Sequence, residues 1–213
     1  MAEPPDFDSA FQARLRDLLV WRRDVRAFRT KALPAGTLER LVDVAALAPS
    51  VGLSQPWRFV AVDDPARRAA IRTCFEACNA EALRQQDPER APSYARLKLA
   101  GLDDAPCHLA VFADRDTVQG HRLGRLTMPE TIDYSAVMAV HTLWLAARAE
   151  GIGVGWVSIL DPGQIAGILG VPEAWRFIGY FCIGYPLEES DTPALERLEW
   201  ERRRTQAGLL LRR

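Results

Sequence analysis

Three arginines surround one aspartate in the stretch WRRDVRAF, residues 21–28, where a helical pattern of apolar residues gives way to a turn. The planar guanidinium group donates two parallel hydrogen bonds, which suits phosphate and carboxylate groups. Arg22, Arg23 and Arg26 are therefore candidates for binding an anion, although an arginine-rich turn is usually just solvated. The simplest role for Asp24 is to pair with one of these arginines.

A second polar stretch, APSVGLSQPW at residues 48–57, lies between a helical pattern and a strand pattern. Ser50 and Ser54 flank a glycine, and the Gln55 amide offers both a donor and an acceptor. This loop can present hydroxyl and amide groups to a planar polar ligand. It can equally be a tight structural turn.

Ser158 lies near the end of a third stretch, GVGWVSI at residues 153–159, which precedes a capped helix. Backbone donors and the helix dipole converge at such a strand end, a favoured place for ligands. No histidine lies near Ser158 and the Gly-x-Ser-x-Gly motif is absent, which excludes a serine hydrolase. Inside a strand pattern, the glycines of GVGW indicate close backbone packing rather than a dinucleotide loop.

The composition is that of a single soluble globular domain: 213 residues, 48% hydrophobic and 26% charged. The net charge of −1 gives no electrostatic reason to expect a nucleic acid or an anionic membrane as partner. The N-terminal residues do not resemble a signal peptide, and no segment is apolar enough to span a bilayer, so we expect a cytoplasmic protein. Four cysteines without a Cys-x-x-Cys pair and three histidines predict reduced thiols and no metal site.

Hydrophobic periodicity predicts helices and strands that alternate irregularly. A capping box at residues 9–12 begins the first helix, and the second helix, over residues 38–48, ends before Pro49. Further helices are predicted at residues 66–85, 130–150 and from Asp161, and strands at residues 57–62, 108–114, 153–159 and 177–187. Residues 85–93 and 115–129 are predicted to be loops, the first of them mobile.

The helix at residues 130–150 is the strongest of these, and it is apolar nearly all round. Such a helix belongs in a core or a subunit interface. His141 lies within it and is expected to be a core residue rather than a ligand.

Taken in order, RRDVRAF, APSVGLSQPWRF and LWLAARAEGIGVGWVSI resemble the FMN-dependent nitroreductase superfamily, over roughly Leu18 to Tyr185. Within it, RRDVR, SVGLSQPW, TMPET followed by YS, and GVGWVSI are similar to the subgroup that makes the lower ligand of vitamin B12. Ordinary nitroreductases usually carry serine where Asp24 stands, and a different segment where GWVSI stands. Both departures favour the subgroup.

The resemblance implies an α+β, nitroreductase-like fold with a central mixed β-sheet flanked by helices. It implies a single FMN-binding domain over residues 1–213, and a homodimer in which a C-terminal arm, about residues 188–213, is exchanged. The implied reaction uses reduced FMN as substrate and O₂ as co-substrate, with no metal, and a separate flavin reductase supplies the reduced FMN. The products are 5,6-dimethylbenzimidazole and D-erythrose 4-phosphate.

The resemblance also implies which residues bind FMN: Arg22, Arg23, Asp24, Val25, Arg26, Ser50, Ser54, Gln55 and Ser158. Asp24 and Ser158 would be the catalytic pair, with Asp24 as the candidate base for a proton at or near C1′ of the ribityl chain. The serines of the loop would act partly from the partner subunit, and one of Arg202 to Arg204 would complete the phosphate site. Residues 85–105 and 115–131 would be lids that exclude water.

Three other functions fit parts of the sequence. One is an ordinary NAD(P)H-dependent FMN nitroreductase or flavin oxidoreductase, and another is a non-catalytic flavin carrier. Nucleic-acid binding through WERRRT, residues 200–205, is the weakest, because the net charge is near zero and aromatic residues are sparse there.

Overall fold

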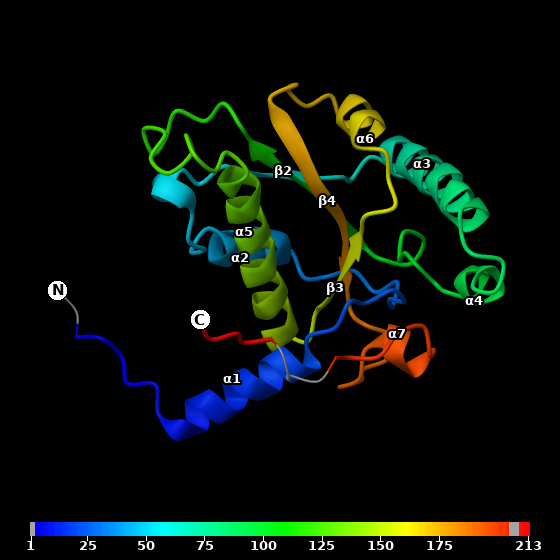
Figure 1. The fold of residues 1–213 in the computed structure, drawn as a ribbon, viewed down its shortest axis with the longest axis horizontal. Helices are drawn as coiled ribbons and strands as arrows, with labels where there is room; N and C mark the ends of the chain where they lie inside the picture. Colours follow the sequence, from blue (N-terminus) through cyan, green and yellow to red (C-terminus); the bar gives the residue numbers. More distant parts are fainter. Residues whose placement is uncertain (1–2, 205–208) are drawn as a thin grey trace.

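A sheet of four strands forms the centre of the molecule, with helices on both of its faces (Figure 1). The computed structural model describes residues 3–204 and 209–213. In their order across the sheet, the strands are β1 (Trp57–Ala61), β2 (Cys107–Asp114), β4 (Trp175–Gly184) and β3 (Gly153–Val157).

Every neighbouring pair of strands is antiparallel, so the sheet is not the mixed sheet that the resemblance implies. Within the described part of the chain, parallel pairing is confined to an isolated bridge between Asp24 and Val154. Next to this bridge, the Asp24 side chain rather than a backbone carbonyl accepts the N–H of Trp156.

The helices agree closely with the periodicity of the sequence. They are α1 (Ser9–Trp21), α2 (Thr37–Ala45), α3 (Pro65–Arg84), α4 (Ala91–Ala95), α5 (Thr131–Ala149), α6 (Pro162–Leu169) and α7 (Ala194–Arg197), with a short 3₁₀ turn at Val51–Leu53.

Two of the local predictions are wrong. The N-cap of α1 is Asp8 rather than Ser9, because the Asp8 carboxylate accepts the N–H of Phe11 at 2.7 Å. The second correction concerns the end of the loop predicted at residues 85–93. Residues 85–90 lie outside regular structure as predicted, but residues 91–93 belong to α4, which has a proline in its first turn.

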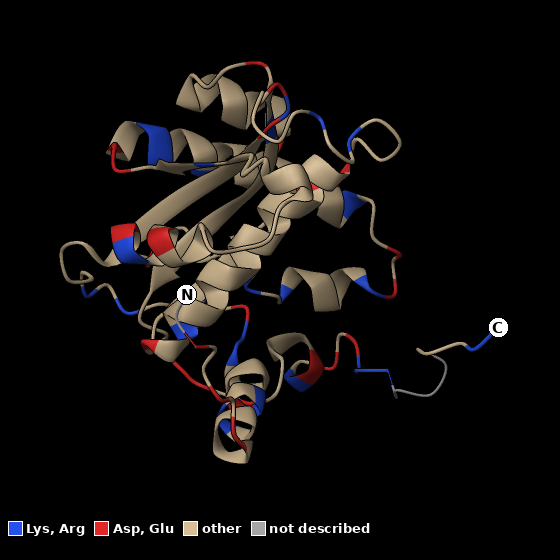
Figure 2. Ribbon diagram, turned by 90° about the vertical axis from the view of Figure 1, so that its left-hand side faces the viewer, with Lys and Arg blue, Asp and Glu red and all other residues tan. Residues whose placement is uncertain are grey.

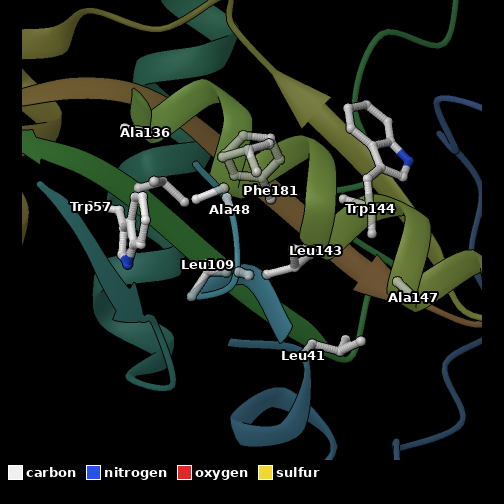
Figure 3. Packing of buried hydrophobic residues seen from close by; sticks show 14 of the residues in the cluster. Leu41, Ala48, Trp57, Leu109, Ala136, Leu143, Trp144, Ala147 and Phe181 are labelled. Atoms are coloured by element: carbon white, nitrogen blue, oxygen red, sulfur yellow. The ribbon is translucent and has the colours of Figure 1, made fainter. Parts of the chain in front are cut away.

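The central strands are buried on both faces because their side chains alternate between two hydrophobic clusters. In β2, Leu109 and Val111 face the cluster covered by α2 and α5, whereas Ala110 and Phe112 face the cluster covered by α3 and α6. Figure 3 shows the first cluster, in which Phe181 of β4 packs under α5. Charged residues gather mainly on loops and on the outer parts of the helices (Figure 2).

Helix α5 is buried against the sheet along one side and exposed along the other. Tyr134, Val137 and Met138 are exposed apolar or aromatic residues on its outer side. His141 is exposed too, so its assignment to the core is wrong: the outer side of α5 lies away from the sheet. Helix α1 projects from the body of the protein, has no buried residue, and exposes Phe11.

A buried histidine gives the fold a pH-dependent stability. The His108 ring lies 2.8 Å from the Tyr180 hydroxyl, and its side chain is 2% exposed. Burial, with a smaller contribution from the charge of Arg68, lowers the pKa of His108 from 6.5 to about 4. The unfolded chain therefore binds a proton before the folded protein does, and stability falls as the pH drops from 6.5 towards 4.

We expect this histidine to contribute about 3 kcal/mol to that loss, as measured by urea unfolding at a series of pH values. His108→Gln, which does not titrate, is the control, because the carboxylates of Glu81 and Glu189 also have lowered pKa values and lose stability in acid. The variant should show a shallower dependence on pH between 4 and 6.5. Equal slopes for variant and wild type would contradict the assignment.

Candidate active site

The three arginines of the opening motif lie where α1 ends and the chain turns towards the sheet. Arg22 is the C-cap of α1 and has an extended backbone. Arg22, Arg23 and Arg26 line a pocket of about 160 Å³. A fourth arginine, Arg203 from the C-terminal segment, lines the same pocket, so the structure selects one residue from the run 202–204.

Positive charge is in excess at this arginine pocket. Burial, then the charges of Arg203 and Arg22, lower the pKa of Arg23, and the charge of Asp191 opposes them. The Arg23 Nε atom is buried and has no hydrogen-bond partner within residues 3–204 and 209–213. A bound anion would relieve the repulsion and supply acceptors for these donors.

Asp24 joins the arginine pocket to the sheet. Its Oδ1 atom accepts the backbone N–H of Trp156 in β3 at 2.8 Å, and its Oδ2 atom accepts Nε of Arg26 at 2.9 Å. The next residue, Val25, donates its backbone N–H to the carbonyl of Val154 at 3.0 Å. Asp24 therefore pairs with an arginine, as its simplest interpretation predicts, and it also fixes the motif to the edge of β3.

The glycines of GVGW permit this close approach, which agrees with the packing role inferred from the sequence. A Cβ atom on Gly155 would lie 2.0 Å from the Val25 carbonyl oxygen, and one on Gly153 would lie 2.7 Å from the Val25 side chain. Val25, predicted to bind FMN, is thus engaged with β3 through both its backbone and its side chain.

Gly155→Ala should displace the arginine motif from β3, because the new methyl group meets backbone rather than a flexible side chain. We expect a loss of about 1–3 kcal/mol of stability in urea unfolding. The control is Gly167→Ala in α6, where a Cβ meets nothing within 4 Å. That change should be neutral or stabilising by up to about 1 kcal/mol. Equal behaviour of the two variants would show that the contact with Val25 is unimportant.

Ser158 directly follows β3 and is exposed. It lies two residues beyond Trp156, whose N–H binds Asp24, so the two positions are about 7 Å apart along the strand. Helix α6 begins at Pro162 with Asp161 as N-cap, the carboxylate accepting the N–H of Gln164 at 2.7 Å, as the sequence predicts. Ser158 therefore directly follows the edge strand to which Asp24 is hydrogen-bonded.

The serines of the 48–57 loop are not among the residues that line the arginine pocket. The Ser50 hydroxyl accepts the N–H of Gln55 at 3.1 Å, and Ser135 of α5 accepts the N–H of Val51 at 3.0 Å. Ser54 is 1% exposed, and its hydroxyl has no partner in the part of the chain that the structure describes. The loop is a tight turn, and within residues 3–204 and 209–213 none of its hydrogen bonds reaches Arg22 or Arg23.

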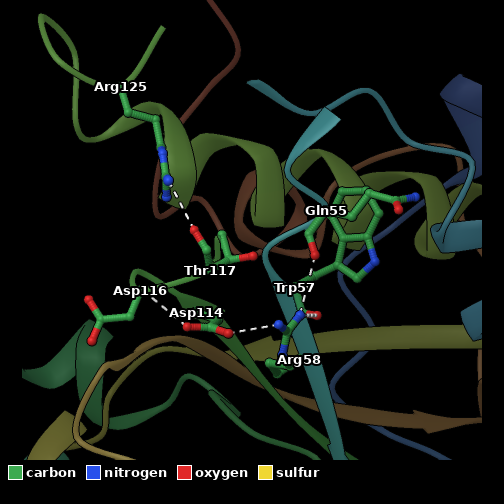
Figure 4. A network of polar contacts seen from close by, with 7 residues as sticks. All are labelled: Gln55, Trp57, Arg58, Asp114, Asp116, Thr117 and Arg125. Carbon is green, nitrogen blue, oxygen red and sulfur yellow. Dashed lines mark hydrogen bonds and ion pairs between the residues drawn. The ribbon is translucent and has the colours of Figure 1, made fainter. Parts of the chain in front are cut away.

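The same loop is joined to residues 115–131 by a polar network (Figure 4). Arg58 donates to Asp114 at 2.7 Å and to the Gln55 carbonyl at 3.3 Å. Gln119 donates to the Gln55 side chain at 3.0 Å. Within the segment, Arg125 donates to the Thr117 carbonyl at 2.9 Å.

This segment, with the start of α5, lines an open cavity of about 770 Å³. Four basic side chains line it: Arg115, His121, Arg122 and Arg125. Val118 and Leu126, 88% and 85% exposed, add apolar surface. The segment at residues 115–131, for which the resemblance implies a role as a lid, therefore forms a wall of this cavity.

The other proposed lid, residues 85–105, contacts both the arginine motif and the C-terminal segment. Arg26 donates to the Lys98 carbonyl at 3.4 Å. Tyr94 of α4 is buried and packs edge-on against Trp200, with 6.1 Å between the ring centres. The C-terminal segment up to Arg204 thus lies beside the rest of the same chain, whereas the resemblance implies an arm, about residues 188–213, that is exchanged between subunits.

Two negative findings apply to residues 3–204 and 209–213. No helix there is long and apolar enough to cross a membrane. No cluster of three or more His, Cys, Asp or Glu residues is arranged there to hold a metal ion. The four cysteines are free.

The chain thus has an α+β fold with a cationic pocket at the edge of its sheet. The chain belongs to the nitroreductase family, which it matches over residues 19–185. This confirms the family and the nitroreductase-like fold that the sequence motifs predict.

Comparison with individual members of the family narrows the resemblance to one kind of enzyme. The chain is 57% identical to the 5,6-dimethylbenzimidazole synthase of Rhodospirillum rubrum, covering 96% of this chain and 97% of the relative. It is 46% identical to the 5,6-dimethylbenzimidazole synthase of Rhodobacter capsulatus, covering 92% and 95%. Among solved structures, oxidised iodotyrosine deiodinase bound to FMN and 3-iodo-L-tyrosine is similar, with a TM-score of 0.70 and 26% identity over 83% of this chain and 91% of that one.

Proposed function

We propose that this protein catalyses the O₂-dependent fragmentation of reduced FMN to 5,6-dimethylbenzimidazole and D-erythrose 4-phosphate. The observation that carries the proposal is the position of Asp24. It lies inside an arginine pocket, in the motif where ordinary family members usually have serine, and it is held by the N–H of Trp156. The 57% identity to a 5,6-dimethylbenzimidazole synthase supports the same reaction.

The arginine pocket is the proposed site for the FMN phosphate. The residues fit that group: the pocket has four guanidinium groups against the single carboxylate that lines it, and the buried Arg23 Nε has no protein acceptor within the described residues. Arg22, Arg23 and Arg203 would hold the phosphate, and Arg26 would contact the polar ribityl chain beside Asp24. Val25 would contribute by keeping this segment against β3.

Asp24 and Ser158 are the proposed catalytic pair. Reduced FMN is the substrate, and its reaction with O₂ supplies the oxidation. The fragmentation must break the bond between C1′ and C2′ of the ribityl chain, so a proton must be moved at or near C1′. Asp24, next to the proposed ribityl site, would take that proton. Ser158, which follows the last residue of β3 and is exposed, would donate a hydrogen bond to the flavin.

The proposed active unit is a homodimer. The outer side of α5, with Tyr134, Val137 and Met138, and the exposed Phe11 of α1 offer apolar surface for a second copy. Ser50, Ser54 and Gln55 would line the flavin from their loop, partly from the partner subunit. The C-terminal arm of about residues 188–213 would be exchanged between the two subunits.

The reaction needs a supply of reduced FMN and a site closed to water. A separate flavin reductase is the proposed source of the reduced FMN. The segments at residues 85–105 and 115–131 would close over the site, since the first contacts Arg26 and the second is joined to Gln55.

The test is to mix the protein with chemically reduced FMN in air and analyse the products by mass spectrometry. The proposal predicts that 5,6-dimethylbenzimidazole forms as FMN disappears. A second reaction contains NADH and oxidised FMN in place of chemically reduced FMN. There the alternative, an NAD(P)H-dependent nitroreductase or flavin oxidoreductase, predicts steady oxidation of NADH with the FMN recovered intact. That result would reject the synthase reaction. A flavin carrier would bind FMN and give neither result.

A further inference from the structure

Trp144, on the side of α5 that faces the core, makes two contacts with the arginine motif. Its indole Nε1 donates to the Arg23 backbone carbonyl at 3.1 Å. The guanidinium of Arg22 lies over its ring, 5.1 Å from the ring centre. Figure 3 shows Trp144 at the edge of the first hydrophobic cluster, with its indole nitrogen turned away from Phe181.

The Trp144 ring is itself firmly placed. It is 8% exposed and packs edge-on against Phe181 of β4, with 6.5 Å between the ring centres. Its hydrogen bond therefore ties the backbone at Arg23 to the hydrophobic core. Because Val25 is bonded to β3 through Val154, the arginine motif is held from two directions, by α5 at Arg23 and by β3 at Val25.

We propose that Trp144 is a positioning residue for the phosphate site, and this inference rests on the proposed function. A long arginine side chain loses rotamer entropy when it binds, and a group that pre-orders it reduces that cost. Stacking against Trp144 confines the Arg22 guanidinium, and the hydrogen bond to the Arg23 carbonyl fixes the point from which the second guanidinium extends.

Trp144→Phe tests the hydrogen bond, since it keeps an aromatic face for Arg22 and removes the N–H donor. We expect the dissociation constant for FMN to rise about 2- to 10-fold, because binding must then also order an arginine side chain that is pre-ordered in the wild type. Riboflavin has the same ring system and ribityl chain but no phosphate, so its dissociation constant should be unchanged. The two dissociation constants, for FMN and for riboflavin, are measured by quenching of flavin fluorescence.

The matched control is Trp175→Phe. Trp175 also lies beneath a guanidinium, that of Arg58 at 5.8 Å from the ring centre, but it belongs to the other hydrophobic cluster. This variant should bind FMN and riboflavin as the wild type does. Urea unfolding shows whether each variant is folded, and Trp144→Tyr gives the same test of the lost N–H if the phenylalanine variant is not.

The outcomes separate this inference from the proposed function. If the wild type binds FMN and riboflavin equally well, the phosphate site itself is wrong. If the wild type prefers FMN and Trp144→Phe weakens both ligands equally, or neither, then Trp144 is only a packing residue and the positioning role is wrong. A selective loss for FMN supports it.

Discussion

Replacing Asp24 with asparagine should slow the formation of 5,6-dimethylbenzimidazole from reduced FMN by about 10²- to 10⁴-fold, the usual contribution of a positioned acid or base. The asparagine amide oxygen can still accept the N–H of Trp156, so the motif should stay against β3. The amide cannot take a proton near C1′. The rate is measured in single turnovers with excess protein, and FMN binding is measured separately.

Arg26→Leu distinguishes proton transfer from the ordering of arginines, because Asp24 also binds Arg26 at 2.9 Å. If Asp24 acts as the base, Asp24→Asn lowers the rate with little change in FMN affinity, and Arg26→Leu mainly weakens binding. If Asp24 only orders its neighbour, the two variants should resemble each other and both should bind FMN poorly. A rate for Asp24→Asn within a few-fold of the wild type would contradict both roles.

Arg23→Ala should raise the dissociation constant for FMN about 10- to 100-fold, because a hydrogen bond between charged groups contributes roughly 1.5–3 kcal/mol. Arg23 is the most informative of the four arginines. Its Nε is buried without an acceptor within the described residues, and its pKa is lowered by burial and by its cationic neighbours. The loss should shrink as salt is added, since the interaction is between charges.

Arg176→Ala is the control for this change, because Arg176 is an exposed arginine of β4 at its N-terminal end. It should bind FMN with wild-type affinity. An Arg23→Ala variant that keeps wild-type affinity would place the phosphate elsewhere, and the cavity of residues 115–131, with its own basic side chains, would then be the next region to examine.

The order of the four strands and of the longer helices was predictable because each of these elements has a clear hydrophobic period and a local end signal, whereas the short helices α4 and α7 have no such period and were not predicted. Asp161-Pro162 begins α6 as expected, and the glycines of GVGW pack closely as expected. Two predictions were wrong because they depended on more than the local period: the N-cap of α1 and the burial of His141. Asp8, a stronger acceptor one position earlier, replaced Ser9 as the cap, and His141 lies on the outer side of α5.

The candidate site was only partly predictable, for a different reason. Arg22, Arg23 and Arg26 are close in sequence, so their gathering needs only a turn. The groups around them come from distant parts of the chain. The N–H of Trp156 binds Asp24, the indole of Trp144 binds the Arg23 carbonyl, and Arg203 lines the same pocket. No local pattern marks Trp144 as a partner of Arg23, because it has the spacing of an ordinary core residue.

The most direct test of the proposed reaction is to follow the fate of one carbon atom. Reduced FMN labelled with ¹³C at C1′ of the ribityl chain is mixed with the protein in air, and the products are analysed by NMR and mass spectrometry. The account predicts that the label appears at C2 of 5,6-dimethylbenzimidazole, in an amount equal to the FMN consumed, and that Asp24→Asn gives almost none. Recovery of the label in intact FMN, while O₂ is consumed, would contradict it.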